Sequence, residues 1–491
     1  MKLSTAVYGA LMLTMTQLSA PATASTSTHV HLRVKHPQHH ETPQHKHLYH
    51  VTGPKSSFKQ LLDPRIKADL NLDVWSIKPA HKTHGKHQDV QLKADIYATQ
   101  DAMDKISSQQ ADAHLQIGSM KATVHTKQQW KLHVKQYIDY DLQEQQDRQA
   151  VRACGNKTQG YMDDIESLDK YTSSAFFDCF RPQDEVFTFL DALAEANPEY
   201  VSVYQNASTT FEKRAIPAYK ISTQGDNDSK KKKKAALYTQ ALIHAREWQA
   251  GAATFYTMAA LLDGLRAKEH AVVELFKTYD WYFVPIVNID GYIYSWEKER
   301  YWRVNRDNKA SKEFEGVDLN RNWGPDEYFN LDPSDVSSET YPGPHAYSEP
   351  ESKGLYDFIM DIENLQGLVD MHSYGGQVLR PFSDSFDSPV EPFGSALVAL
   401  ADAVAAATSD EYASMPALDL YPAYGCFDDA FYREFNFTVP ALTIEVEGHD
   451  FTAPQKTIRK VGANINSGLR QFAKEVAKYR STIEKKGIKL P

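Results

Sequence analysis

The sequence predicts an α/β fold in which helices flank a central mixed sheet, preceded by a smaller α+β domain. Beyond about residue 175, apolar runs of strand length alternate with segments of helical spacing, as in α/β domains. The nearly continuous apolar run 281–288 suits an interior strand buried on both faces. Ahead of these, the alternating runs 72–77 and 90–97 predict strands of a separate small domain. A length of 491 residues exceeds what one core usually fills, which supports two domains.

Composition places the chain among ordinary globular proteins. Charged residues make up 24% of the sequence, and there is no collagen-like or coiled-coil bias. The formal net charge of −10 argues against nucleic acid as the main partner. No apolar run is long enough to span a bilayer, so we expect no membrane anchor.

The first 24 residues have the pattern of a secretory signal peptide. Lys2 precedes an apolar segment, 6–15, and the small-residue cleavage pattern Ala22-Thr23-Ala24. We therefore expect a secreted, extracellular protein.

Export permits disulfide bonds, but three cysteines are an odd number. Cys154 with Cys179 is the most plausible pair, and Cys426 would then stay unpaired. Four sequons are glycan acceptors in a eukaryotic secretory pathway, although such tripeptides also arise by chance: Asn156, Asn206, Asn227 and Asn436.

Histidine crowds the segment after the signal peptide, particularly from His29 to His50. Because residues 25–60 have little apolar content, we predict a disordered His-rich leader. A tract that holds metal is the alternative.

The small domain is predicted to span residues 61–150. Besides its two strands it should contain a helix over 100–107 and another strand over 115–120. Its last element is predicted to be a long helix, because four residues recur on one helical face: Trp130, Val134, Tyr137 and Ile138.

The long helix is expected to continue, as a connecting helix, into the polar end of the small domain. The polar tract 143–152 has no apolar stripe to bury, so we expect it to be solvated. Arg148 and Arg152 would then be open to a trypsin-like activating protease, with residues 151–174 as an activation linker.

The larger domain is predicted to span residues 175–480. Its expected elements are a helix over 184–194, strands over 200–204 and 218–222, a strand within 235–243, a helix over 250–265, the strand 281–288, a helix over 354–362, a strand over 365–370, a helix over 394–407, a strand over 441–446 and a closing helix over 455–478. The five lysines 230–234 are expected to form a solvated loop between two strands.

Residues suited to metal binding lie where strands end, which is where α/β folds place their sites. The spacing of His244 and Glu247 can put an imidazole and a carboxylate on one side of a tight turn. Taken alone, this pair is as readily a surface pair. His372, which follows the strand 365–370, can supply a second imidazole. A catalytic zinc uses three such protein ligands and keeps one position open for water.

Polar groups suited to anion recognition lie between these ligands. The planar fork of an arginine such as Arg321 binds a carboxylate through two parallel hydrogen bonds. Asp318 can accept the second imidazole N–H of a metal-bound histidine and fix its tautomer, and Arg303 adds another fixed positive charge. An exposed loop with structural salt bridges is the alternative. Spacing leaves open whether Glu445 or Glu447, on one face of the last strand, is the general base.

Together these motifs resemble the zinc metallocarboxypeptidases of the pancreatic carboxypeptidase A/B family. The matching segments are 244–248, 302–303, 316–323, 338–341, 372–374 and 421–423. The resemblance covers about residues 175–480 and implies an eight-stranded mixed sheet. The stretch 60–150 is similar to the family's inhibitory propeptide, which implies a zymogen, and we expect a monomer.

The resemblance also implies roles for individual residues. The ligands implied for one zinc ion are His244, Glu247 and His372. The residues implied to bind a substrate's terminal carboxylate are Asn320, Arg321 and Tyr421. Arg303 would polarise the scissile carbonyl, Glu445 would be the general base and acid, and Arg246 would touch the substrate further from its end.

The sequence also predicts a specificity. An ungapped alignment from Tyr421 puts Asp428 where family members that prefer C-terminal Lys or Arg carry an aspartate. A buried carboxylate there would pair with a cationic side chain and penalise an apolar one. The family's usual Leu-Arg-Asp-Thr-Gly after the glutamate is replaced by residues 446–450, and the segment leading to Glu445 is slightly longer. We therefore predict a preference for basic residues over aromatic or aliphatic ones.

The predicted function is zinc-dependent hydrolysis of the C-terminal peptide bond of peptides and proteins. Anchoring the terminal carboxylate makes such an enzyme an exopeptidase, since an internal peptide bond has no such group. The alternative is a pseudopeptidase that binds peptide tails without cleaving them. The complete set of catalytic residues, Glu445 included, counts against it.

Overall fold

The fold is described from a computed structural model of the chain. The structure describes residues 46–61, 70, 72–79, 91–108, 133–138, 140–163, 165–223, 234–309, 316–329, 336 and 338–490. The expected signal peptide, the histidine tract up to residue 45, the strand over 115–120 and the lysines 230–233 lie outside these residues. In the described part, none of the helices combines the length and the apolar character needed to cross a membrane.

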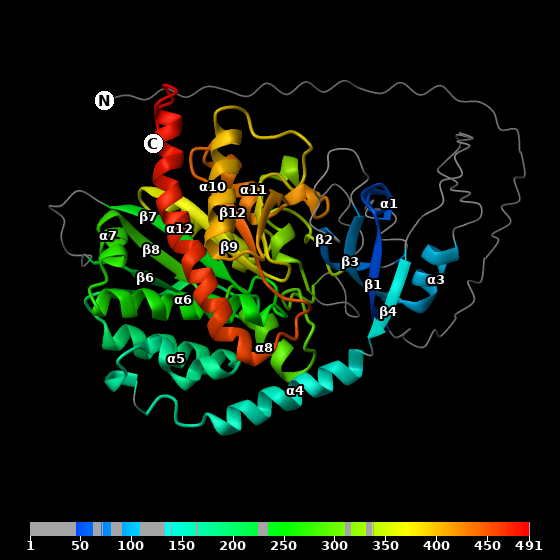
Figure 1. The fold of residues 1–491 in the computed structure, drawn as a ribbon, viewed down its shortest axis with the longest axis horizontal. Helices are drawn as coiled ribbons and strands as arrows, with labels where there is room; N and C mark the ends of the chain where they lie inside the picture. The colour runs from blue at the N-terminus through cyan, green and yellow to red at the C-terminus, as the bar shows by residue number, and fades with distance from the viewer. Residues whose placement is uncertain are drawn as a thin grey trace, which may run out of the picture. The chain divides into compact units, whose positions relative to one another are not determined.

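An eight-stranded mixed sheet forms the centre of the larger domain, as predicted (Figure 1). The strand order is β11-β10-β12-β9-β7-β8-β6-β5. The central strands β12, β9, β7 and β8 run parallel, and antiparallel strands flank them. The strands are β5 (Val201–Thr209), β6 (Ala215–Ile221), β7 (Ala235–Ala241), β8 (Tyr279–Val284), β9 (Leu365–Ser373), β10 (Gln377–Arg380), β11 (Ala413–Pro416) and β12 (Ala441–Val446).

Helices flank this sheet. The predicted helices are present with shifted ends, and three short ones, α7, α8 and α11, were not predicted. The helices are α5 (Gln183–Ala196), α6 (Trp248–Arg266), α7 (His270–Thr278), α8 (Ile289–Glu297), α9 (Pro350–Met360), α10 (Phe393–Thr408), α11 (Phe427–Glu434) and α12 (Ile458–Glu484). The long helix α12 packs on α6 and α10.

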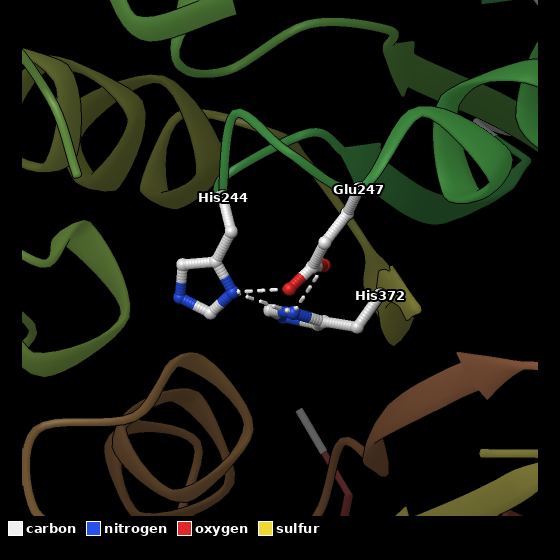
Figure 2. Close-up of side chains that lie close together, drawn as sticks. All are labelled: His244, Glu247 and His372. Carbon is white, nitrogen blue, oxygen red and sulfur yellow. Dashed lines mark hydrogen bonds and ion pairs between the residues drawn. The ribbon is translucent and has the colours of Figure 1, made fainter. Parts of the chain in front are cut away.

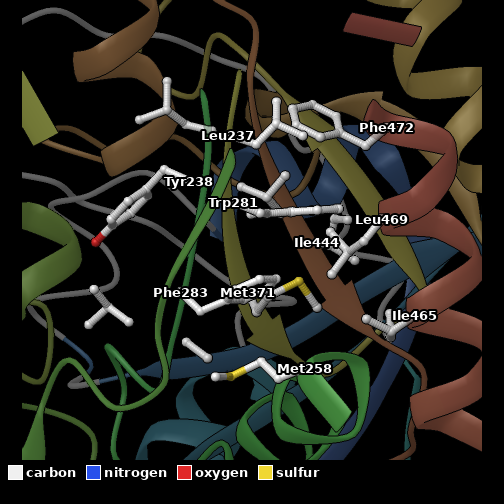
Figure 3. Packing of buried hydrophobic residues seen from close by; sticks show 14 of the residues in the cluster. Leu237, Tyr238, Met258, Trp281, Phe283, Met371, Ile444, Ile465, Leu469 and Phe472 are labelled. Carbon is white, nitrogen blue, oxygen red and sulfur yellow. The ribbon is translucent and has the colours of Figure 1, made fainter. Parts of the chain in front are cut away.

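Alternation along β9 decides which side chains enter the core. Gly367 faces α12, where an added Cβ would lie 2.8 Å from Phe472, so only glycine permits this close approach. Met371, on the same face, packs with residues of α6, β8 and α12 in the large apolar core (Figure 3). By the two-residue period of a strand, Asp370 and His372 point to the opposite face. The site is therefore built on the face turned away from α12.

The small domain is a four-stranded antiparallel sheet of order β2-β3-β1-β4. Its elements are β1 (Lys46–Pro54), α1 (Lys55–Leu61), β2 (Asp73–Pro79), β3 (Gln91–Thr99), α3 (Gln100–Ser108) and β4 (His133–Ile138). The α+β character and three of these elements were predicted. The leader expected over 25–60 is wrong from Lys46 onward, because β1 pairs on both sides and buries Leu48 and Val51.

The first part of the predicted long helix is also wrong, because residues 133–138 are the strand β4 (His133–Ile138). The apolar spacing there fits a helix, but pairing with β1, such as Leu48 with Ile138, decides in favour of a strand. The connecting helix expected to continue into the following polar tract is present there, as the single helix α4 (Tyr140–Lys157).

Contacts with the larger domain compensate for the missing apolar stripe of α4. Asp147 pairs with the buried Arg300 at 2.8 Å, and Arg148 donates to the carbonyl of Trp296 at 2.7 Å. The predicted disulfide between Cys154 and Cys179 is confirmed. These contacts hold the helix on the larger domain.

Candidate metal centre and substrate cavity

The turn after β7 positions His244 and Glu247. Leu242 has a left-handed backbone, with φ of 56°, which ends the strand and starts the turn. Asn288 supports the turn, because its Nδ2 donates to the carbonyl of Ile243 at 3.2 Å. Glu247 is the N-cap residue of α6, so its carboxylate starts from the end of a rigid helix.

The third residue, His372, is the last residue but one of β9, which ends at Ser373. Figure 2 shows the three side chains converging. His244 Nδ1 lies 2.8 Å from Glu247 Oε1 and 3.1 Å from His372 Nδ1, and His372 Nδ1 lies 3.0 Å from Glu247 Oε2. All three residues are buried, and their candidate ligand atoms lie within 4.8 Å of one another.

Carboxylates fix the tautomers of both histidines. His244 Nε2 lies 3.0 Å from Asp318 Oδ1, and His372 Nε2 lies 2.8 Å from Asp370 Oδ2. An ionised carboxylate only accepts, so each Nε2 carries a proton and donates it. In neutral rings both Nδ1 atoms then present lone pairs to each other and to the carboxylate of Glu247.

This arrangement fits a metal cation. Ligand atoms at about 2.0–2.2 Å from a tetrahedral zinc lie roughly 3.3 Å from one another, close to the separations found here. A buried cluster of lone pairs without a cation would be repulsive. Two imidazoles and one carboxylate are a donor set of catalytic zinc sites, and a carboxylate on the second nitrogen of a ligating histidine is the usual support.

Arg303 is fixed beside these ligands by Asp318. Its Nη2 and Nε donate to Asp318 Oδ2 at 2.7 and 3.1 Å, and its Nη1 lies 3.3 Å from His244 Nδ1. Burial opposes ionisation of Asp318, but Arg303 and His244 outweigh it and hold the pKa of this carboxyl well below its usual range. Asp318 therefore orients an imidazole and a guanidinium together.

Asn320 and Arg321 follow Asp318 in a short 3₁₀ turn, Leu319–Arg321. Asn320 Oδ1 accepts from the amide of Phe427 at 2.9 Å, which ties the turn to the start of α11. Arg321 Nη2 lies 3.5 Å from the hydroxyl of Tyr421. A buried guanidinium, an amide and a phenol thus line one part of the cavity.

Glu445 lines the same cavity from β12, where it is the register partner of His372. Burial raises the pKa of Glu445 to about 8; the charge of His372 opposes this shift and that of Glu247 adds to it. Glu447 lies beyond the end of β12, and its carboxylate accepts from Asn464 Nδ2 on α12 at 3.1 Å. The two glutamates therefore have different surroundings, and Glu445 is the one that faces the metal ligands.

Asp428 lies in the first turn of α11 and also lines the cavity. Only 2% of its surface is exposed, and its Oδ2 has no hydrogen-bond partner among the described residues. Burial raises the pKa of Asp428 well above its usual range, and repulsion from Asp429 and Asp370 adds to the effect.

Arg246 faces the small domain across the cavity. Its Nη1 donates to Asp73 Oδ2 and to Glu339 Oε2, both at 3.0 Å, and its guanidinium lies over the rings of Trp75 and Phe451. Burial opposes ionisation of Asp73, but Arg246 holds the pKa of this carboxyl below its usual range. Val74 and Trp75 are themselves part of the cavity wall.

The structure thus brings the predicted site residues together. One cavity is lined by His244, Arg246, Glu247, Arg303, Asn320, Arg321, His372, Tyr421, Asp428 and Glu445, and Asp318 supports two of them. Sequence reasoning missed Asp370, although its two-residue spacing from His372 on a strand was a usable signal. It also missed the contact of Arg246 with Asp73, which no local pattern indicates.

The comparisons with known proteins agree with this geometry. The profile of the zinc carboxypeptidase family matches residues 186–465. The chain belongs to the zinc carboxypeptidase family. It is a metallocarboxypeptidase, a hydrolase, and the family resemblance predicted from the motifs is confirmed.

Similar proteins include carboxypeptidases named A and carboxypeptidases named B. The carboxypeptidase is 28% identical to carboxypeptidase B2 of Rattus norvegicus over 63% of this chain and 73% of that protein. It is 31% identical to carboxypeptidase B of Homo sapiens over 62% of this chain and 72% of that protein. It is also 32% identical to the inactive metallocarboxypeptidase ECM14 of Paracoccidioides lutzii, over 43% of this chain and 36% of that protein.

Solved structures share the fold. Carboxypeptidase A from Helicoverpa armigera superposes with a TM-score of 0.70 at 23% identity, over 89% of this chain and 99% of that one. The thrombin activatable fibrinolysis inhibitor superposes with a TM-score of 0.62 at 20% identity, over 88% and 99% of the two chains. The eight-stranded mixed sheet with its helices is therefore the fold of carboxypeptidases.

Proposed function

We propose that the protein is a secreted zinc carboxypeptidase that removes single residues from the C-termini of peptides and proteins, made as a zymogen. The observation that carries this proposal is the convergence of three metal donors, a guanidinium and a separate carboxylate on one cavity. The family implies zinc, and His244, Glu247 and His372 are the residues that would hold it; a zinc ion there would act as a Lewis acid and lower the pKa of water towards about 7.

The residues around the donors divide the chemical work. Glu445 takes a proton from the attacking water and returns it to the leaving amine. Arg303, held by Asp318, donates to the oxygen on which negative charge grows in the transition state. These two groups act on the scissile bond.

Selection of the last residue rests with a second group of side chains. Arg321, with Asn320 and Tyr421, holds the terminal carboxylate of the substrate. An internal peptide bond offers no such carboxylate, so cleavage is confined to the chain end. Arg246 contacts the substrate further from its end once the small domain has left.

A basic residue is the preferred substrate end. Asp428 is a buried carboxylate in the cavity, and one of its oxygens finds no partner in the described part of the chain. Leaving it opposite an apolar side chain costs free energy. A lysine or arginine side chain supplies the missing charge. Comparing otherwise identical peptides that end in Lys, Arg, Phe and Leu tests this preference.

Inhibition by the small domain is part of the proposal. Trp75 lies in the cavity wall and Asp73 forms an ion pair with Arg246, so both must leave before a peptide can bind. Arg148 and Arg152 are the proposed cleavage sites, and both lie within α4. A cut at either leaves Cys154 and its disulfide with the catalytic domain. N-terminal sequencing of the active form should therefore begin shortly after one of these arginines.

The decisive experiment uses the processed, zinc-loaded protein with a peptide and with the same peptide as its C-terminal amide. We expect release of one free amino acid from the free acid and almost none from the amide. Endoproteolytic products, or equal cleavage of both peptides, would contradict the assignment.

A pseudopeptidase that binds peptide C-termini without cleaving them is the second candidate. The 32% identity to the inactive ECM14 protein favours it. Glu445 and Arg303 in the cavity argue for catalysis instead. A processed, zinc-loaded chain that binds peptide tails but never releases an amino acid would establish this candidate.

A further inference from the structure

A second carboxylate, Asp370, lies two residues before the candidate metal ligand His372 on β9. On β9 it shares a face with His372. Its register partner on β12 is Thr443, and its partner on β7 is Gln240. Side chains in register on neighbouring strands share a face of the sheet, and Thr443 lines the substrate cavity. Asp370 therefore lies beside the cavity wall, on the side of the sheet that carries the site.

The hydrogen bonds of Asp370 satisfy only half of its carboxylate. Oδ2 accepts from His372 Nε2 at 2.8 Å, but Oδ1 has no partner among the described residues, although the side chain is wholly buried. Asp428, which lines the cavity, likewise has a buried oxygen, Oδ2, without a hydrogen-bond partner among the described residues. Helix α11, which carries Asp428, packs against β9, which carries Asp370. Repulsion from Asp370 also contributes to the raised pKa of Asp428.

Buried carboxylates with open oxygens are expensive unless a cation or donors reach them. Gln240, the register partner of Asp370 on β7, is neutral, and no described residue pairs with its Nε2. The histidine that contacts Asp370 is a candidate metal ligand and is neutral when it binds a metal. A cationic group that enters the pocket would bring both positive charge and hydrogen-bond donors to these open oxygens.

We propose that Asp370 is a second specificity-determining residue, which together with Asp428 forms a two-carboxylate pocket for the cationic side chain of the substrate's C-terminal residue. This inference rests on the proposed carboxypeptidase function and on its basic preference. Asp370 thereby has two tasks, orienting His372 through one oxygen and attracting the substrate's cation through the other. An ammonium carries three donors and a guanidinium five, so either has donors to divide between the two carboxylates.

The first test is the substitution Asp370→Asn in the processed, zinc-loaded enzyme. Asparagine keeps an oxygen that accepts from His372 Nε2 but removes the charge. We expect kcat/KM for a peptide ending in Lys to fall at least about 10-fold more than for the same peptide ending in Leu. The loss for the Lys peptide should lie mainly in KM. Equal losses for the two peptides would overturn the proposal, because a residue that only positions His372 affects both alike.

Asp318→Asn is the matched control. Asp318 supports His244 in the way that Asp370 supports His372, but it also fixes Arg303. We expect Asp318→Asn to lower kcat/KM for the Lys and Leu peptides by the same factor. A selective loss on Lys peptides in this control too would show that any charge lost near the metal mimics specificity, and would also overturn the proposal.

A second measurement does not depend on the stability of Asp370→Asn. Arginine and citrulline have nearly the same shape and differ in charge, so the ratio of their inhibition constants as free amino acids reports the charge of the pocket. We expect arginine to inhibit the wild type at least about 10-fold more strongly. Asp428→Asn should keep part of this advantage, because Asp370 remains. If Asp428→Asn alone removes the advantage completely, Asp370 does not take part.

Failure of the inference and failure of the proposed function are distinguishable. A wild-type enzyme that cleaves Leu or Phe peptides but not Lys or Arg peptides is a carboxypeptidase without the proposed pocket. A zinc-loaded, processed wild type that cleaves none of the peptides refutes the proposed function itself.

Discussion

Replacing Glu445 with glutamine should separate substrate binding from catalysis. The amide has almost the same shape as the carboxylate but cannot take a proton from water, so the step assigned to Glu445 is lost. A positioned general base contributes about 100- to 10,000-fold to rate, or roughly 3 to 5 kcal/mol of transition-state stabilisation. We expect kcat to fall by that range while KM changes little, because Arg321 and Asn320 still hold the terminal carboxylate.

Glu447→Gln is the control for this experiment. Glu447 is two residues further along, contacts Asn464 on α12 and does not line the cavity. The assay is release of the last residue from a short peptide by both variants, normalised to bound zinc. We expect Glu447→Gln to retain activity within a few-fold of the wild type. Full activity in Glu445→Gln, together with a large loss in Glu447→Gln, would refute the assignment of the base.

Three further predictions concern the small domain and stability. Asp73→Asn should raise the activity of the uncleaved chain several-fold, because Arg246 loses its charged partner from the small domain; an unchanged rate of the uncleaved chain would contradict this. Cys154→Ser opens the bridge to Cys179 and should lower the free energy of unfolding by about 2 to 4 kcal/mol, measured by denaturant titration. Burial raises the pKa of Glu351 to about 8 from 4.5, so the folded chain holds a proton between these pH values that the unfolded chain has released, and stability falls as the pH rises through this window. Glu351→Gln should therefore stabilise the protein by a few kcal/mol at pH 8 and by little near pH 4, and equal effects at the two pH values would refute the reasoning.

The candidate site was more predictable from sequence than parts of the fold. His244, Glu247 and His372 lie at or near strand ends, so local patterns indicate where their side chains gather. The tautomers of the two histidines follow only from the structure. The carboxylates that contact their second ring nitrogens lie 74 positions away for His244 and two positions away for His372. The family motifs supplied the rest of the set.

The small domain was harder to predict because its elements depend on distant pairing. Residues 133–138 have a spacing compatible with a helix, but their backbone pairs with β1, more than 80 residues earlier along the chain. Strand β1 itself lies in a histidine-containing segment of low apolar content, yet it is central in its sheet and buries Leu48. Local propensity does not report such pairing.

The electrostatic contacts of the connecting helix α4 could not be predicted from local sequence either, because they are made with distant residues. Its polar sequence has no stripe to bury, which indicated a solvated connector. In the structure, Asp147 of this helix forms an ion pair with the buried Arg300, and the disulfide of Cys154 fixes the end of the helix. Neither partner can be found from the helix sequence alone.

The central claim is that His244, Glu247 and His372 hold one zinc ion on which peptide hydrolysis depends. The most direct test is to remove metal from the processed enzyme with a chelator and to follow hydrolysis of a peptide with a free C-terminus while zinc is added back. We predict that activity is lost on removal, rises in proportion to bound zinc and reaches its maximum at one zinc ion per chain. Full activity in the metal-free enzyme, or saturation with zinc without any release of amino acid, would contradict the claim.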